Sequence, residues 1–296
     1  MEKKYKLTEE SINYCGKILY RIEALKDFAN VIKGDKGGYV QSEDNLSQRG
    51  NCWIYGNAKV SHNAIVCGNA KVCGNAEVYG DTEVFGNAQV SDNTKVFDNV
   101  EVYGNAKISG NAIVCGNARV YDNALVYGNA LIYGDAYVFG KAQVSGYAKV
   151  YSNTEVFGNA KVFCDATVCC KARVYGNAQV FDDAIVSDNA KVYDDAFVYD
   201  NAKVSGNVIV CGNAKVCGNA EIKDNSDYIV FKNWWSSGRY FTWTRSNNMW
   251  RVGCFYGTGE ELIAKAYKDS EISGREYKRV VGYVESILQD SKGIGD

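Results

Sequence analysis

The chain has a single histidine, His62, and histidine is the side chain most often used as a general base near neutral pH. It stands in the triplet Ser61-His62-Asn63, at a place where neighbouring segments carry Gly-Asn. A second interpretation is that His62 is a tolerated turn residue. The sequence favours this second interpretation, because no inserted loop interrupts the pattern to build a substrate pocket around the ring. His62 is therefore the single catalytic candidate, and a catalytic role is not the main prediction.

Cations alternate with aromatic rings near the C-terminus, as they do in sites for single-stranded nucleic acids or nucleotides. The residues concerned are Lys232, Trp234, Trp235, Arg239, Arg245, Trp250 and Arg251. The competing interpretation is that a small sheet needs large rings for its core. Residues 226–296 carry ten Lys and Arg against nine Asp and Glu, so no positive field supports binding. The segment is still the best candidate for a ligand site, and the ligand would be small and nucleotide-like.

No metal and no cofactor are predicted. Aspartates recur at Asp182-Asp183, Asp188, Asp194-Asp195 and Asp200, but aspartate is an ordinary turn residue as well as a calcium ligand. The chain has no Cys-x-x-Cys motif, and a lone histidine argues against zinc. Six of the eleven cysteines share one position of a repeat, which serine, tyrosine and phenylalanine fill elsewhere: Cys67, Cys73, Cys115, Cys169, Cys211 and Cys217. This pattern indicates free thiols in a reducing cytoplasm.

The repeat that must position these candidates has a period of six residues. Every sixth residue from Ile54 to Ile222 is valine or isoleucine, at 29 positions of which 25 are valine. The residues between them repeat as in Val126-Tyr127-Gly128-Asn129-Ala130-Leu131. A fixed short period over this length indicates a solenoid, because each unit can bury its apolar face only against the next unit.

Alternation along each strand predicts that alanine and valine point inward, while polar residues and then Tyr, Phe, Cys or Ser point outward. The Gly-Asn and Asp-Asn pairs that follow suit tight corners. The pattern resembles the hexapeptide repeat of left-handed parallel β-helices, with three hexads in a coil of 18 residues. The resemblance implies an all-β fold, a single-stranded left-handed parallel β-helix of about nine coils. Such proteins are often CoA-dependent acyltransferases, so the resemblance also implies that activity as an alternative.

A coil of 18 residues places aromatic rings on one side of seven successive coils. We call these residues the aromatic face: Phe85, Tyr103, Tyr121, Phe139, Phe157, Tyr175 and Tyr193. An exposed apolar ladder is typical of a contact surface, here most readily for a second copy of the chain. Alternatively, the rings stabilise neighbouring coils by stacking on one another. Both interpretations stay open.

Both ends of such a rod should be capped, because a bare end exposes unpaired strand edges. We predict an N-terminal cap over residues 1–50, with two strands in 5–24 around Cys15-Gly16-Lys17 and a turn at 34–38. The β-helix then spans 51–225. Residues 226–296 are predicted to form a small α+β module, with strands at 228–231, 240–245 and 250–255. Two helices should follow, each opened by a capping box: Thr258 with Glu261, and Ser273 with Glu276.

The ends also resemble known families. Residues 22–28, Gly37-Gly38-Tyr39-Val40 and Cys52-Trp53-Ile54-Tyr55 resemble the N-terminal cap of the YdcK-like hexapeptide-repeat β-helix proteins. With the repeat, this resemblance covers residues 5–222 and implies an acyltransferase-like fold but no catalytic residues. Residues 253–258 with Glu260-Glu261-Leu262 resemble a C-terminal module of phage and prophage proteins, which implies a phage origin.

The favoured prediction is a non-catalytic, cytoplasmic β-solenoid that presents its C-terminal module and aromatic face to a host protein or to itself. A phage origin would suit a protein that blocks a host defence component. The alternatives are a CoA-dependent acyltransferase and a structural or assembly protein. The net charge of −2 argues against binding to double-stranded DNA, and no apolar run is long enough to cross a membrane.

Overall fold

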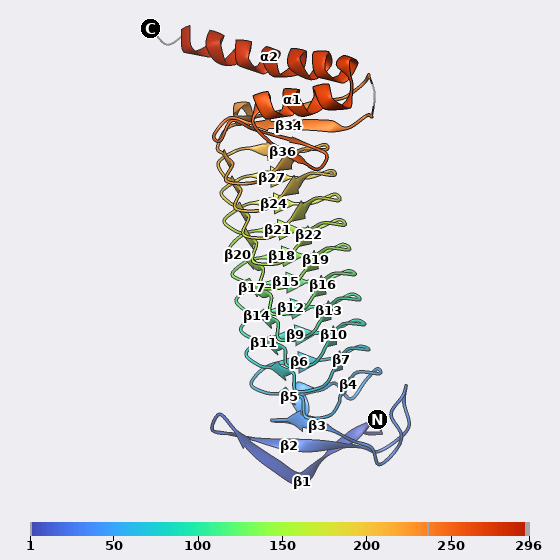
Figure 1. Cartoon of the computed structure of the whole chain (residues 1–296). Coiled ribbons are helices and arrows are strands. Elements are labelled where there is room, and N and C mark those ends of the chain that lie inside the picture. The colour runs from blue at the N-terminus through green and yellow to red at the C-terminus, as the bar shows by residue number, and fades with distance from the viewer. Residues whose placement is uncertain (1, 236, 294–296) are drawn as a thin grey trace.

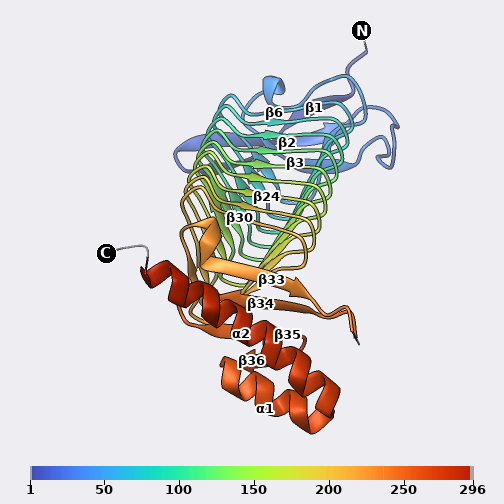
Figure 2. The same ribbon diagram turned by 90° about the horizontal axis from the view of Figure 1, so that it is seen from above.

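The computed structural model describes residues 2–235 and 237–293 of the chain. Short parallel strands wind into a rod, with a β cap at its N-terminal end and two helices beyond its last coil (Figure 1). Viewed along the rod, successive coils lie over one another (Figure 2). The predicted parallel β-helix is confirmed. It has about ten coils where the hexads suggested about nine, since one of its three sheets has ten strands.

Each side of the rod is one sheet, whose hexad strands are all parallel, and each sheet is named here after its first hexad strand. The β5 sheet has 13 strands, the first three from the cap: β1 (Tyr5–Tyr14), β2 (Lys17–Ala24), β3 (Lys36–Val40), β5 (Lys59–Val60), β8 (Glu77–Val78), β11 (Lys95–Val96), β14 (Ile113–Val114), β17 (Leu131–Tyr133), β20 (Lys149–Tyr151), β23 (Thr167–Val168), β26 (Ile185–Val186), β29 (Lys203–Val204) and β32 (Glu221–Ile222). The β4 sheet has ten: β4 (Trp53–Ile54), β7 (Lys71–Val72), β10 (Gln89–Val90), β13 (Lys107–Ile108), β16 (Leu125–Val126), β19 (Gln143–Val144), β22 (Lys161–Val162), β25 (Gln179–Val180), β28 (Phe197–Val198) and β31 (Lys215–Val216). The β6 sheet has nine: β6 (Ile65–Val66), β9 (Glu83–Val84), β12 (Glu101–Val102), β15 (Arg119–Val120), β18 (Tyr137–Val138), β21 (Glu155–Val156), β24 (Arg173–Val174), β27 (Lys191–Val192) and β30 (Ile209–Val210).

The interior of the rod is a single column of small side chains, apolar except for the buried Thr82, Thr94 and Thr154. Strands pair in register 18 residues apart, as in Val126 with Val144, so each inward valine stacks on the next. Val126 and the preceding inward residue, Ala124, are both 0% exposed. Burying a valine contributes about 1.5–3 kcal/mol as an upper estimate. The repeated inward valines therefore hold the coils together.

The corners explain why the chain uses Gly, Asp and Asn where it does. The first corner residue has a positive φ, which glycine adopts without strain and aspartate tolerates, as at Gly128 (φ 73°) and Asp122 (φ 59°). The next residue stacks by amide bonds, as from Asn87 Nδ2 to Asn105 Oδ1 at 3.1 Å. Corner aspartates accept a backbone N–H from the following coil, and Asp188 Oδ2 does so from Gly206 at 3.0 Å. These carboxylates are thus engaged in corner-to-corner bonds.

The N-terminal cap continues one side of the rod. The predicted hairpin is confirmed, because β1 and β2 are antiparallel and Tyr14 pairs with Lys17. β3 is antiparallel to β2 but parallel to β5, with Val40 opposite Val60. The predicted turn at 34–38 is wrong at its second half, since Gly37 and Gly38 lie inside β3. A Cβ on Gly38 would lie 2.5 Å from the carbonyl oxygen of Ala58, so the missing side chain lets β3 lie against the first coil.

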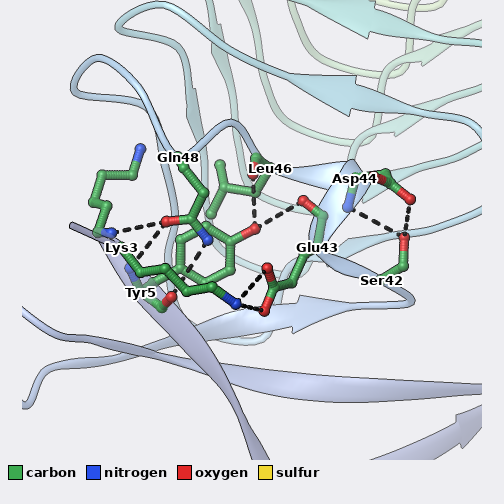
Figure 3. A network of polar contacts seen from close by, with 8 residues as sticks. Lys3, Tyr5, Ser42, Glu43, Asp44, Leu46 and Gln48 are labelled. Atoms are coloured by element: carbon green, nitrogen blue, oxygen red, sulfur yellow. Dashed lines mark hydrogen bonds and ion pairs between the residues drawn. The ribbon is translucent and has the colours of Figure 1, made fainter. Parts of the chain in front are cut away.

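A polar network ties the first strand to the loop before the rod (Figure 3). The hydroxyl of Tyr5, a fully buried residue, lies 2.7 Å from the carbonyl of Leu46 and 3.0 Å from that of Glu43. Gln48 Oε1 accepts the backbone N–H of Tyr5 at 3.3 Å. Lys3 pairs with Glu43, which begins the short 3-10 helix η1 (Glu43–Asn45), at 2.8 Å. These bonds close the N-terminal end of the core.

Tyr5→Phe should lower the free energy of unfolding by about 1–3 kcal/mol, because it leaves a buried carbonyl without its donor. Chemical denaturation followed by circular dichroism measures this change. Tyr127→Phe is the matched control, since Tyr127 is 41% exposed on the rod. Equal losses in the two variants would show that the Tyr5 hydroxyl has no special role in the cap.

The C-terminal module has four antiparallel strands and two helices. After the 3-10 helix η2 (Asn225–Asp227) come β33 (Tyr228–Lys232), β34 (Tyr240–Thr244), β35 (Met249–Val252), β36 (Phe255–Gly257), α1 (Gly259–Asp269) and α2 (Glu271–Gly293). The first two predicted strands are confirmed. The third, at 250–255, is wrong, because the chain turns at Gly253 (φ 57°) and Val252 pairs with Phe255 across a hairpin.

The capping box predicted for the first helix is confirmed. Thr258 Oγ1 accepts the N–H of Glu261 at 3.3 Å, and Glu261 Oε2 accepts that of Thr258 at 2.9 Å. The second predicted box is wrong, because α2 begins at Glu271 and Ser273 lies in its first turn. Ser270 takes the capping role, since its hydroxyl accepts the N–H of Ser273 at 3.0 Å. Within the described residues, neither helix is long and apolar enough to span a membrane.

The two helices pack on the four-stranded sheet through apolar side chains. The buried residues of this second core are Phe241, Trp243, Trp250, Val252, Leu262, Val281 and Val284. Trp243 and Trp250 are directly opposite each other on β34 and β35, so both rings point to the helices. The module therefore has its own core beside that of the rod.

Candidate functional site

A pocket lies where the tip of the N-terminal hairpin covers the first coils of the rod. Its volume is about 220 Å³. Its lining comes from the hairpin tip, from the corner after β5, from β8 and the residue after it, and from β11: Tyr14, Cys15, Ser61, His62, Glu77, Tyr79 and Lys95. We call it the His62 pocket. Over the described length of the rod, the repeat has no inserted loop beside His62, as expected, but the N-terminal hairpin provides a wall of this pocket that nothing in the repeat predicts.

The backbone of His62 is held from both sides. Its N–H donates to Gln41 Oε1 at 2.9 Å, and its carbonyl accepts from Asn45 Nδ2 at 2.9 Å. Its φ is 60°, which is costly for a histidine and is maintained by these bonds. The ring nitrogen Nδ1 lies 3.1 Å from Ser61 Oγ. When Nδ1–H donates to that hydroxyl, Nε2 has the lone pair of a base.

The floor of the pocket combines an ionised carboxylate with two cations. Glu77 lies 3.6 Å from Lys59 Nζ and 3.3 Å from Lys95 Nζ. Burial opposes ionisation of Glu77, but hydrogen bonds from Tyr14 and Lys95 outweigh it and hold its pKa below the usual range. Burial and then the bond to Glu77 raise the pKa of Tyr14, which therefore stays a hydrogen-bond donor. Lys59 also lies 4.8 Å from the Tyr14 ring and holds it in place.

The remaining walls are apolar or nucleophilic. The ring of Tyr79 stacks on Phe97 at 5.0 Å and lies 6.1 Å from the His62 ring. Cys15 is an exposed thiol at the hairpin tip, with a φ of 48°. The pocket thus brings together a base, a hydroxyl, a thiol and two hydrogen-bond donors. Such a set can activate an acceptor and stabilise the oxyanion of an acyl-transfer reaction.

The hairpin that covers the pocket is fixed by an ion-pair cluster. Glu10 on β1 accepts from Arg21 Nε and from Lys36 Nζ, each at 2.8 Å. Arg21 also donates to the carbonyls of Gly37 at 2.7 Å and Gly56 at 3.0 Å, so the cluster reaches the rod. The hydrogen bonds from Lys36 and Arg21 lower the pKa of Glu10 to about 2.

This cluster predicts a pH dependence of stability. The pKa of Glu10 is lower in the folded chain than its ordinary value of 4.5, so its stabilising contribution is present above about pH 4.5 and is lost as the pH falls towards about 2. Glu10→Gln should therefore melt below the wild type near neutral pH and match it near pH 2. Thermal melts across this range test the point. A gap that stays constant with pH would exclude Glu10 as the titrating group.

The seven C-terminal binding candidates do not converge on one site. Trp250 is 2% exposed in the core, and Trp235 packs on Tyr277 at 6.1 Å, whereas Trp234 is 82% exposed. Lys232 lies over the ring of Tyr240 at 5.8 Å. The other cations lie apart as well. Arg251 lies over the ring of Tyr199 in the rod. Arg239 lines a small cleft beside α1, together with Val252, Phe255, Leu262, Lys265, Ala266, Asp269 and Tyr277. Arg245 follows β34 and donates its backbone N–H to Asp227 at 2.7 Å. A nucleotide-like ligand at these residues stays a prediction.

The aromatic face forms a continuous stack on the β6 sheet. Neighbouring rings from Phe85 to Tyr193 are 4.8 or 4.9 Å apart and nearly parallel. All seven residues are half-buried by their neighbours. This geometry supports the interpretation that the rings stabilise the coils. Their use as a partner surface stays a prediction.

Comparison with known proteins relates the repeat to one family of solenoids. Residues 54–68, 118–131, 172–188 and 196–212 match the model of the YdcK β-solenoid repeat. The uncharacterized acetyltransferase YdcK of Escherichia coli strain K12 is 39% identical over 61 residues, which cover 18% of this chain and 19% of YdcK. The chain thus spans about a fifth of that relative's length. The repeat is similar to YdcK-like repeats, as the sequence predicted.

Among solved structures, the chain is similar to the UDP-N-acetylglucosamine acyltransferase of Francisella novicida. The identity is 15%, the alignment covers 57% of this chain and 59% of that chain, and the TM-score is 0.24. The matched segments of the family model all lie in the rod. The resemblance of the C-terminal module to phage proteins, and the phage origin inferred from it, stay predictions.

Proposed function

We propose that this chain is a β-solenoid acyltransferase that transfers an acyl group from a thioester, such as acetyl-CoA, to a hydroxyl or amine acceptor in the His62 pocket. The observation that carries the proposal is the placement of the lone histidine, with its backbone fixed on both sides, in a pocket closed by the N-terminal hairpin. The name of YdcK, an uncharacterized acetyltransferase, supports the same class of reaction.

His62 is the base of the proposed reaction. Nε2 removes the proton of an acceptor hydroxyl or amine, and the acceptor attacks the thioester carbonyl. The carbon–sulfur bond breaks, and the CoA thiolate takes up the proton from His62. We assign the oxyanion to the ammonium of Lys95, which lines the same pocket and has three N–H donors, so it can bind the oxyanion as well as Glu77.

The proposal is tested by calorimetric titration of the full chain with acetyl-CoA and by filling the pocket. Ser61→Phe places a ring in a slot that Tyr79 and Phe97 occupy on the next coils, so the repeat can accept it. Ser187 is on the same side of the rod, seven coils further along, and Ser187→Phe is the matched control. We expect micromolar binding in the wild type and in Ser187→Phe, and none in Ser61→Phe. Absence of binding to the wild type, or equal binding to both variants, would contradict the proposal.

The second candidate is a non-catalytic binding protein, and a specific observation favours it. Trp234 is 82% exposed between β33 and β34, and Ile272 and Tyr283 on α2 are 62% and 57% exposed. An exposed tryptophan is a common anchor of protein interfaces. The partner would be a host protein, as in a phage-encoded blocker of defence, or a second copy.

The binding function is tested with Trp234→Ala and, as a control on the rod, Tyr147→Ala, since Tyr147 is 60% exposed. Affinity capture should recover a partner with the control and not with Trp234→Ala. Mass photometry separates the remaining alternative, because open-ended oligomers would indicate an assembly protein. A monomer that captures no partner and binds acetyl-CoA would leave only the acyltransferase.

A further inference from the structure

Two adjacent thiols face each other in the C-terminal half of the rod. Cys169 follows β23 and is 7% exposed, whereas Cys170 is exposed at the next corner, where its φ is 67°. Their Sγ atoms are 3.6 Å apart. The hydroxyl of Tyr151, on the preceding coil, forms a hydrogen bond with Cys169 that raises the pKa of Tyr151 to about 12. The buried thiol is therefore held next to the exposed one.

The corner at this place departs from the repeat. Cys170-Lys171 replaces the usual Gly-Asn, and a cavity of about 380 Å³ opens along the edge, lined by Ser152, Asn153, Cys170, Lys171, Asp188 and Asn189. The stacked amides on this edge run to Asp135, which accepts from Asn117 at 2.8 Å, and resume from Asn189 to Asn207 at 2.9 Å. The thiol pair therefore borders a cavity at a place where the corner-to-corner amide stacking is interrupted.

A direct disulfide does not suit these two cysteines. Adjacent Cα atoms are about 3.8 Å apart across a trans peptide, whereas disulfides span roughly 4.4–6.8 Å. Structural zinc is also a poor fit, because it needs four ligands and the described residues contain no group of three or more His, Cys, Asp or Glu placed to hold a metal. A single bridging atom that needs only two thiolates from the protein fits the pair better.

We propose that Cys169 and Cys170 form a binding site for trivalent arsenic compounds, with one arsenic atom bonded to both sulfurs. An arsenic oxide reacts with the two thiols so that two As–S bonds form, two S–H bonds break, and the oxygen leaves as water. The oxidation state of arsenic does not change, so no oxidant is required. Cys170 is the first thiol to react because it is exposed, and Cys169, 3.6 Å away, closes the ring.

The site is tested with phenylarsine oxide on the full chain. Intact-mass spectrometry counts the adducts that survive excess glutathione, since a monothiol reverses single-thiol adducts and a closed dithiol ring resists it. One adduct should survive in the wild type and should be removed by dithiothreitol. Cys169→Ser and Cys170→Ser should each retain none. Cys115→Ser should retain one, because Cys115 is a single thiol on the same side of the rod.

An adduct that survives in Cys170→Ser, or none in the wild type, would overturn the site. Circular dichroism of each variant establishes that the rod is folded, and in these serine variants the shape of the side chain is nearly unchanged. His62→Asn should bind the arsenical as the wild type does, because the two sites lie on different coils. Failure of this proposal is thus distinct from failure of the acyltransferase proposal.

Discussion

Val126→Asp is expected to lower the free energy of unfolding by more than about 4 kcal/mol, the range reserved for severe core defects. Val126 is 0% exposed and stacks between Ile108 and Val144 in the interior column. Its stacked neighbours and the preceding inward residue, Ala124, are all apolar, so a carboxylate there must be buried without compensation or protonated. Chemical denaturation followed by circular dichroism measures the loss.

The neighbouring residue provides the control. Leu125 is on the same strand but points outward and is half-buried, so Leu125→Asp should cost about 1 kcal/mol or less. The two substituted residues are adjacent in the sequence, but Val126 faces the core and Leu125 faces outward. Similar losses in both would contradict the inward stacking of the valines.

His62→Asn is expected to lower acyl transfer from acetyl-CoA by about 10²–10⁴-fold, the contribution of a positioned general base. Asparagine tolerates a positive φ, so this substitution removes the imidazole while it preserves the corner at φ 60°. The Michaelis constant should change little, since the other walls of the pocket remain. Steady-state release of CoA measures both parameters.

Ser152→Asn is the control for this experiment. Ser152 occupies the corresponding corner of the same edge with a φ of 62°, five coils away from the pocket. Its turnover should equal that of the wild type. Wild-type turnover in His62→Asn, or an equal loss in both variants, would remove His62 from the mechanism.

The rod could be predicted from the sequence because its rules are local and repeated. Val126, like every other hexad valine, points inward because side chains alternate along each short strand. Asp188, like Gly128, occupies a corner because it can adopt a positive φ. Each unit repeats the same strand and corner, so an error in the prediction of one unit does not affect the prediction of the next. The cap and the first capping box, at Thr258, also follow from short-range patterns.

The candidate site could not be predicted, because it depends on contacts between distant segments. Cys15 and His62 line one pocket although they are far apart in the sequence, and nothing near either residue indicates the other. The unusual histidine at a glycine corner was the only local signal. Lys4 is a similar case, because its ammonium is buried against the carbonyl of Cys52 at 2.9 Å, a partner that its own sequence neighbours do not suggest.

The C-terminal module shows a different difficulty. Cations and aromatic rings that alternate along a sequence are typical of a nucleic-acid-binding surface. In the folded module, strand pairing places these residues in different surroundings. Trp243 and Trp250 face each other and turn inward, whereas Arg251 turns towards the rod. Only Trp234 stays largely exposed among the tryptophans that the sequence selected as binding residues. The sequence therefore identifies the aromatic residues, but the register of the paired strands determines which of them are exposed to a ligand or partner.

The most direct test is a crystal structure of the full chain soaked with CoA. We predict density for the thiol end of CoA in the His62 pocket, between the hairpin tip and β8, with a ring nitrogen of His62 within about 3.2 Å of a reacting atom. CoA bound only at the C-terminal module, with the His62 pocket empty, would contradict the proposed function.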